Sequence, residues 1–246
     1  MFSLFTAQLI INFDQTGLNI TPTSDWTMEQ CGASDVEILC KEDKRQITCV
    51  LACTLTGALL PPQLVYGGKT ARCHPSYTFP SDWDITHSEN HWSNSATMER
   101  YVNSILAPYC NHLRGSDGIP DDQWALCILD VFKAHQKDTV LKAFAQHRIK
   151  VVFVPPNCMG VLQPLDISGN GTFKAHMKDA FQEWYASHVA ASVQDEEEAL
   201  VNVDTRLTTL KPLHAAWIVR AWEALSTNTS VLRNGWVKAG INDLIE

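Results

Sequence analysis

Short apolar runs rich in valine and isoleucine recur along the first two thirds of the chain, separated by polar, glycine-rich and proline-rich segments. β-Branched side chains fit a buried, pleated strand better than a helix, so these runs predict strands. Five runs are long enough: residues 7–14, 45–54, 59–66, 124–129 and 150–154. The second and third are joined around Thr56-Gly57, which predicts an antiparallel hairpin and, together with the first run, a three-stranded meander.

Apolar residues at intervals of three and four predict helices in much of the remaining chain. The expected helices span residues 95–110, 138–147, 171–190, 213–225 and 231–241. Helix 138–147 lies between the fourth and fifth strands, and this order implies a parallel pair with a right-handed crossover. The aromatic residues of helix 171–190 form a broad stripe, which we interpret as core rather than as a nucleotide-stacking surface. Residues 16–40 and 67–90 are expected to be loop and irregular structure.

A hairpin-rich first half followed by a strand–helix–strand second half is the order of an RNase H-like fold. We therefore expect an α/β domain with a mixed five-stranded sheet, an antiparallel meander plus parallel strands, flanked by helices. Residues 1–192 would form this domain. Residues 193–246 would form an acidic linker, built around the run at 195–198, and a C-terminal helical appendage.

Composition limits what the chain can do. Of its 246 residues 45% are hydrophobic, yet no apolar run reaches the roughly 18 residues of a membrane span, so no membrane partner is expected. The eight cysteines include no CxxC pair, which argues against zinc and favours reduced thiols. The apolar N-terminus lacks a basic region and a cleavage site, which argues against a signal peptide. A net charge of −8 predicts weak affinity for DNA from this chain alone.

Three aspartates carry the candidate chemistry. Asp14 and Asp130 each follow an apolar run, so both carboxylates are expected at the C-terminal ends of buried strands, where sites in α/β sheets assemble. Asp166 follows Pro164, which suits a first helical turn, and would lie near the positive end of that helix dipole. A single aspartate there would most often be a helix cap. Three hard oxygen donors on neighbouring elements instead suit Mg²⁺ or Mn²⁺.

The segments around these aspartates resemble a known family. NFDQTG (residues 12–17), LDVFKAH (129–135) and PPNCMGVLQPLD (155–166) are similar to the three acidic motifs of the DDE superfamily of endonucleases, in the branch of pogo, Tigger and jerky-like transposases. The 35 residues between Asp130 and Asp166 match the spacing of that branch. The likeness covers roughly residues 8–190. It includes Gly32, Val36, Ile47-Thr48, Gly57, Leu60-Pro61-Pro62 and Gly68-Lys69, with a weaker match at 234–241.

The resemblance implies an RNase H-like fold, a nuclear location, DNA as partner and action as a homo-oligomer. It implies that Asp14, Asp130 and Asp166 are both catalytic residues and ligands of two Mg²⁺ or Mn²⁺ ions, about 4 Å apart in such sites. The residues expected to orient these carboxylates are Asn12, Gln15, His135, Asn157 and Gln163. Two lysines, Lys174 and Lys178, are candidates to contact DNA phosphates. The sequence departs from the family at Gln15, often Glu there, and at Cys158-Met159-Gly160, usually small hydroxylated residues.

Two functions from different classes remain open. The first is an active transposase-like endonuclease core for phosphodiester hydrolysis and strand transfer. Only thirteen residues precede Asp14, so the helix-turn-helix region typical of the family is not expected to be present. The second is a non-catalytic, domesticated module that binds nucleic acid or protein through the same fold. A nuclease acting on RNA–DNA hybrids is a distant third, because the motifs match the transposase branch.

Overall fold

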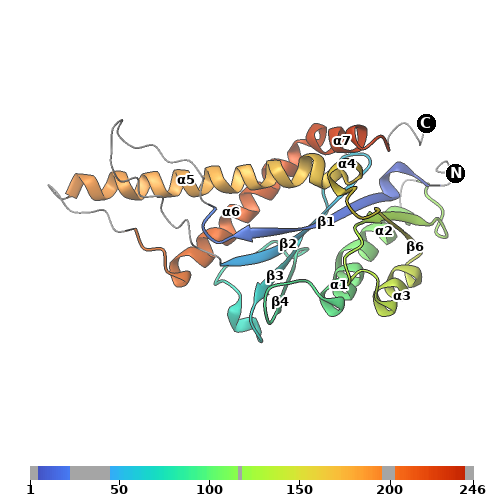
Figure 1. The fold of residues 1–246 in the computed structure, drawn as a ribbon, viewed down its shortest axis with the longest axis horizontal. Helices are drawn as coiled ribbons and strands as arrows, with labels where there is room; N and C mark the ends of the chain where they lie inside the picture. The colour runs from blue at the N-terminus through green and yellow to red at the C-terminus, as the bar shows by residue number, and fades with distance from the viewer. Residues whose placement is uncertain (1–4, 23–44, 116–117, 196–202, 242–246) are drawn as a thin grey trace.

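The computed structural model describes residues 5–22, 45–115, 118–195 and 203–241, and all structural statements concern these residues (Figure 1). Their centre is a mixed sheet of six strands in the order β4-β3-β2-β1-β5-β6. The strands are β1 (Ile10–Asn19), β2 (Gln46–Thr54), β3 (Gln63–Gly67), β4 (Asp84–Ser88), β5 (Ala125–Leu129) and β6 (Ile149–Phe153). Strands β1, β2 and β3 pair antiparallel, whereas β1, β5 and β6 pair parallel, which confirms the predicted meander and crossover.

The sixth strand corrects the prediction of five. Strand β4 lies within residues 67–90, expected to be irregular, and pairs parallel with β3. Its sequence DITHS contains one isoleucine among polar residues, so the hydrophobic pattern gave no strand signal. Tertiary partners decide its place: the buried carboxylate of Asp84 accepts a hydrogen bond of 2.7 Å from Gln63 of β3.

Strand β1 also differs from expectation. It begins after a 3₁₀ turn, η2 (Ala7–Leu9), and continues to Asn19, so Asp14 lies within the strand rather than at its end. Residues 16–19, expected to be loop, stay extended because β2 pairs with β1 along its whole length, from Ile11↔Thr54 to Asn19↔Gln46. The ladder with β5 is much shorter and ends at Asn12↔Ile128. From residue 13 to residue 19, β1 therefore has no strand neighbour among the described residues on the side that β5 occupies earlier in the strand. The remainder of the expected loop, residues 23–40, lies outside the described residues.

Helices cover both faces of the sheet. They are α1 (Ser95–Tyr101), η4 (Val102–Leu106), α2 (Ala107–Arg114), α3 (Asp138–Gln146), α4 (Met159–Leu162), η5 (Leu165–Gly169), α5 (Asn170–Asp195), α6 (Leu207–Thr227) and α7 (Thr229–Lys238), with a short 3₁₀ turn η3 (Ala71–Cys73). Segments α1, η4 and α2 follow one another without a break, and they pack with α3 on one face around Phe13 and Tyr101. None of the described helices is long and apolar enough to cross a membrane.

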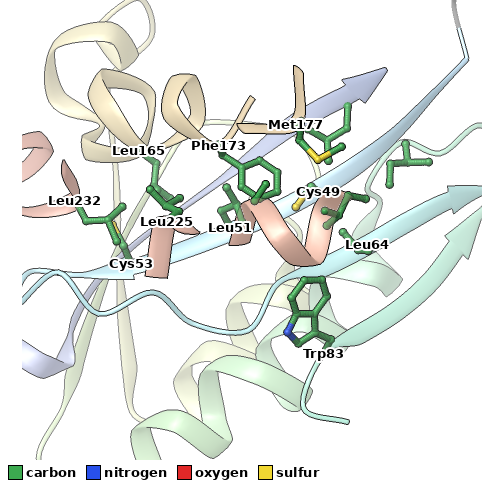
Figure 2. Close-up of a cluster of buried hydrophobic side chains, with 14 of the residues drawn as sticks. Cys49, Leu51, Cys53, Leu64, Trp83, Leu165, Phe173, Met177, Leu225 and Leu232 are labelled. Atoms are coloured by element: carbon green, nitrogen blue, oxygen red, sulfur yellow. The ribbon is translucent and has the colours of Figure 1, made fainter. Parts of the chain in front are cut away.

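The opposite face carries η5, α5, α6 and α7 (Figure 1). Figure 2 shows Leu165, Phe173 and Met177 packed with Leu225 and with side chains of β2 and β3. The aromatic stripe of α5 is therefore core where it faces the sheet, as predicted. The C-terminal helices share this core through Ile218, Leu225 and Trp236, all buried. A domain boundary near residue 193 stays a prediction, and the acidic residues 196–198 lie outside the described residues.

Helix α7 contacts η5 through a glycine. A Cβ added at Gly235 would collide with the carbonyl oxygen of Pro164 and lie 2.5 Å from Oγ of Ser168. Only a residue without a side chain lets the two helical segments approach this closely. The contact holds η5, and therefore Asp166, against the C-terminal helix.

Gly235→Ala should destabilise the protein by about 1–3 kcal/mol, because the colliding atom is backbone and cannot rotate away. Gly171→Ala in α5 is the matched control: nothing lies within 4 Å of its added Cβ, so alanine should stabilise by up to about 1 kcal/mol. Urea unfolding of both variants measures the difference. Equal stabilities for the two variants would contradict close packing of α7 on η5.

Candidate functional site

Asn12 joins the three elements that carry the predicted site. Its side chain is fully buried in β1. Its amide Nδ2 donates to the carbonyl of Ile128 in β5 at 2.9 Å, and its Oδ1 accepts from the backbone N–H of Leu165 at 3.0 Å. Leu165 is the first residue of η5, where a helical N–H has no partner within the helix. One side chain therefore aligns the end of β5 and the start of η5 with β1.

Asp14 and Asp166 meet as a result. Asp14 lies two residues beyond Asn12 on the same face of β1, and Asp166 follows Leu165. The amide Nδ2 of Asn170 donates to Oδ2 of Asp14 at 2.6 Å and to Oδ1 of Asp166 at 3.2 Å. Asn170 reaches both because η5 is a single π-helical turn, in which its backbone N–H bonds to the carbonyl of Leu165. One amide group thus bridges two carboxylates that would otherwise repel.

The electrostatics of Asp14 reflect this crowding. Burial and then the neighbouring charge and hydrogen bond of Asp166 raise the pKa of Asp14 to about 8, and hydrogen bonds from Gln15 and Asn170 offset only part of the rise. In the metal-free protein the neutral form of the Asp14 carboxyl, with a proton shared toward Asp166, is therefore favoured more than in a free aspartate. A cation between the two carboxylates would replace that proton and remove their mutual repulsion.

Asp130 follows β5 and is held by a histidine. Nδ1 of His135 lies 2.7 Å from Oδ1 of Asp130, and the backbone N–H of Phe132 also contacts this oxygen at 3.4 Å. Nε2 of His135 lies 2.7 Å from Nε2 of Gln15 in β1. If the imidazole is neutral with its proton on Nδ1, it donates to Asp130 and accepts from Gln15. The ring is nearly inaccessible and packs edge-on against Phe13 at 5.2 Å.

The fold brings the three aspartates to the region where β1, β5 and η5 meet, but their carboxylates do not converge on one point. Asn12 of β1 pairs with Ile128 of β5. Asp14 follows Asn12 by two residues and Asp130 follows Ile128 by two residues, so the two aspartates lie at the same level along neighbouring chain segments. Within the described residues, however, the three carboxylates do not form a group whose ligand oxygens all lie within 4.8 Å of one another. Asp14 and Asp166 form the close pair, and Asp130 stands beside them, bonded to His135.

Of the five residues predicted to orient the carboxylates, three contact the site and two do not. Asn12, Gln15 and His135 have the contacts described above. Asn157 is exposed, in a left-handed conformation with φ 64° in the loop after β6, and no contact to an aspartate is seen. Gln163 is fully buried, and neither polar atom of its side chain has a partner among the described residues. Asn170 was missed, although its spacing of four residues from Asp166 was a usable signal for a shared helical face.

The two predicted phosphate-binding lysines continue the site along α5. Lys174 and Lys178 follow Asn170 by one and two helical turns. With Met177 they line a hollow of about 200 Å³, whose other wall is residues 17–19 of β1 and Pro22. The uncovered edge of β1 and the lysine face of α5 therefore run side by side away from Asp14.

The donor set fits hard divalent cations. The side chains gathered here offer carboxylate and amide oxygens, which Mg²⁺ and Mn²⁺ prefer, and no cysteine is among them. Asp14, Asp130 and Asp166 are the residues that would hold such ions. His135 engages Oδ1 of Asp130 and leaves Oδ2 for a metal ion, in line with the rule that metal-binding carboxylates are themselves hydrogen-bonded.

Comparison with known proteins supports the family. Two curated relatives, "Pogo transposable element with KRAB domain" from Mus musculus and from Homo sapiens, are each 22% identical, over 263 and 240 residues, and each match covers 96% of this chain. The chain spans only 39% and 36% of their lengths. Their names describe those proteins, and the activity of a whole relative does not pass to this chain by the match alone.

Solved structures that match are Mos1 transposases. The Mos1 paired-end complex with left transposon end has TM-score 0.48 and 8% identity, covering 91% of this chain and 56% of that chain. The isolated Mos1 catalytic domain has TM-score 0.40 and 10% identity, covering 92% and 84%.

A family model described as "DDE superfamily endonuclease" matches residues 44–236. The match includes Asp130 and Asp166 and begins after Asp14, whose place beside Asp166 comes from the structure. Because it spans more than half of the chain, the protein belongs to the DDE superfamily of endonucleases.

Proposed function

We propose that this chain is a transposase-like endonuclease core that hydrolyses DNA phosphodiester bonds with divalent metal ions held by Asp14, Asp130 and Asp166. The observation that supports it most is the pair formed by the buried Asp14 and the exposed Asp166, held together by Asn12 and Asn170 beside the end of β5. Holding a buried carboxylate against a second one is costly unless a cation compensates their charge, and metal binding from the exposed side of Asp166 would supply that compensation.

Two divalent ions, when bound, supply an activated water on one side of the scissile phosphate and stabilisation of the leaving oxygen on the other. The chain's own residues have separate tasks. Asp14 and Asp166 provide anionic oxygens at one position, with Asn170 orienting both. Asp130 provides the oxygen that His135 leaves accessible, and Gln15 keeps the imidazole turned toward it. Mos1 paired-end complexes with Mn and with Mg are among the solved structures similar to this chain.

The DNA strand would run along the hollow between β1 and α5. Lys174 and Lys178 would contact phosphates further along the strand from the cleaved bond, since α5 continues directly from η5, which carries Asp166. The net charge of −8 opposes tight binding by this chain alone. We further propose that recognition of a particular DNA end and strand transfer need additional protein, either other segments like those of the longer relatives or a second copy in a homo-oligomer. A nuclear location follows from this activity.

Two features favour the non-catalytic alternative. Among the described residues the ligand oxygens of Asp14, Asp130 and Asp166 do not all lie within 4.8 Å of one another, and the pKa of Asp14 is raised by burial and by Asp166. A domesticated module that binds nucleic acid or protein would tolerate both features. The two functions differ in whether metal draws Asp130 into the site.

Asp130→Asn should abolish Mg²⁺- or Mn²⁺-dependent nicking of supercoiled plasmid, by at least about 1,000-fold, because the change removes an anionic ligand without altering size. Asp121→Asn is the matched control: Asp121 is exposed in the turn before β5, at the opposite end of the strand from Asp130. Agarose gels report the conversion to open circles. If the folded wild-type chain nicks no DNA with either metal, the non-catalytic alternative holds.

Stability of the metal-free protein should fall as pH rises. The pKa of Asp14 is raised from 3.8 to about 8 on folding, so its contribution is fully present below pH 3.8 and is lost as pH rises toward 8. The slope should reach about 1.4 kcal/mol per pH unit between these values. Urea unfolding in EDTA measures it at pH 5, 6.5 and 8.

Asp14→Asn should flatten this pH profile, and Mg²⁺ should restore stability at pH 8 in the wild type only. Other titrating groups are common to both proteins, so the difference between the profiles isolates Asp14. Parallel profiles for wild type and variant would contradict the raised pKa.

Lys174→Gln and Lys178→Gln should each weaken DNA binding and lower the slope of log affinity against log salt by about 1, because each lysine neutralises one phosphate. Cleavage at saturating DNA should be unchanged. Lys142→Gln, an exposed lysine of α3 on the other face of the sheet, is the control. Fluorescence anisotropy over a salt series measures the slope, and unchanged slopes in both α5 variants would place the DNA elsewhere.

A further inference from the structure

The sheet edge formed by β4 carries a second cluster of metal-binding side chains, three strands away from β1. Cys73 ends the turn η3, His74 follows it, and His87 lies in β4. Within the described part of the chain, these three are the group of His, Cys, Asp or Glu residues whose ligand atoms all lie within 4.8 Å of one another. All three side chains are half-buried, which leaves them reachable from solvent.

The spacing of the donor atoms suits a small tetrahedral cation. Nε2 of His74 lies 3.2 Å from Nδ1 of His87. Two imidazole nitrogens bound to one tetrahedral Zn²⁺ at about 2.0–2.1 Å would be separated by about 3.3 Å. The observed pair therefore needs almost no movement to share an ion. A simple hydrogen bond between the two rings also explains 3.2 Å, so the thiol of Cys73 is what distinguishes a metal site.

The fold holds Cys73 in place through two contacts and the neighbouring His74 through a third. A Cβ added at Gly68 would lie 2.5 Å from Cβ and 2.9 Å from Sγ of Cys73, so the cysteine is seated directly on the glycine backbone. Nζ of Lys211 in α6 donates to the carbonyl of Cys73 at 2.8 Å. The ring of Tyr66 lies 5.6 Å from that of His74. The thiol position is set by packing rather than by a free loop.

The neighbouring charges are compatible with a thiolate–imidazole site. Nζ of Lys211 lies at the carbonyl of Cys73, and Arg100 is paired with Asp84 at 2.6 Å. A bound cation would displace the thiol proton, and the resulting thiolate would compensate part of the added charge.

We propose that Cys73, His74 and His87 bind one Zn²⁺ ion that fastens η3 to β4. Zinc is the cation of choice because sulfur and imidazole ligands suit it and do not suit Mg²⁺. Three protein ligands leave a fourth position for water. An open hollow of about 370 Å³ lined by His74, Tyr77, Phe79 and Trp83 lies next to the cluster and gives that position access to solvent.

The zinc ion would cross-link the segment between β3 and β4, which contains little regular structure. Between β3 and β4 the chain forms only η3 and turns, and β4 itself has one sheet neighbour. Joining residues 73–74 to residue 87 closes this segment on itself, which small, weakly packed segments commonly need. The site is independent of DNA cleavage and makes no use of the aspartates.

Cobalt substitution tests the proposal on the full chain. The metal-free protein is titrated with Co²⁺ in excess Mg²⁺, which occupies the carboxylate site. One equivalent should give a thiolate-to-cobalt charge-transfer band and visible bands typical of tetrahedral Co²⁺, and Zn²⁺ should displace them. Zn²⁺ should also raise the unfolding temperature. A folded wild-type chain without the thiolate band would overturn the proposal.

Two variants and one control identify the ligands. Cys73→Ser should remove the thiolate band, and His87→Gln should weaken Zn²⁺ binding by more than about 100-fold, since indirect contacts to a metal site alone cost about 10–100-fold. Cys158→Ser, at the other half-buried cysteine of the described residues, should change neither. If Cys73→Ser does not fold, the cobalt spectrum of the wild type and the Zn²⁺ affinity of His87→Gln still test the proposed site. A band that persists in folded Cys73→Ser, or affinity unchanged in His87→Gln, would also overturn the site.

Discussion

The two hydrogen bonds of the buried Asn12 amide are the constraint on which the candidate site depends. A buried amide without partners is costly, and Asn12 satisfies Nδ2 on Ile128 and Oδ1 on Leu165, at sequence separations of 116 and 153 residues. These partners are the last residue of β5 that pairs with β1 and the first residue of η5. The same amide therefore terminates one parallel ladder and caps a helical turn. Asp14 and Asp166 then come together because each lies one or two residues from these anchor points.

Holding two carboxylates together has a cost that the rest of the fold must offset. Desolvation and repulsion raise the pKa of Asp14 to about 8, which means that its charged form destabilises the folded protein in the absence of a cation. The compensating contacts lie directly beneath: Leu165 and Phe173 are fully buried against β2, and Gly235 lets α7 approach Pro164. The C-terminal helices thus support the element that carries Asp166. Any metal held by Asp14 and Asp166 would therefore be coupled to the packing of Gly235, some 70 residues further along the chain.

The two candidate metal sites differ in ligand chemistry and lie on different strands. Oxygen donors gather where β1, β5 and η5 meet, whereas sulfur and imidazole donors gather at the edge strand β4. Hard Mg²⁺ or Mn²⁺ and borderline-soft Zn²⁺ would therefore sort between the sites by ligand preference rather than by competition. One site would supply chemistry, and the other would fasten η3 to the edge strand β4.

Local sequence determined much of this protein. Valine- and isoleucine-rich runs specified five strands, helical spacing specified the main helices, and the positions of Asp14, Asp130 and Asp166 in family-like motifs indicated where chemistry would lie. Only tertiary structure decided that the polar segment DITHS is a strand, that β1 continues past Asp14, and that Asn170 bridges two carboxylates while Asn157 contacts none. The same holds for Cys73 and His87, which come together because β4 pairs with β3. Hydrophobic periodicity indicates which face of a helix or strand is buried. The contacts above depend instead on which distant strands pair, and strand pairing produces no periodic pattern in a single sequence.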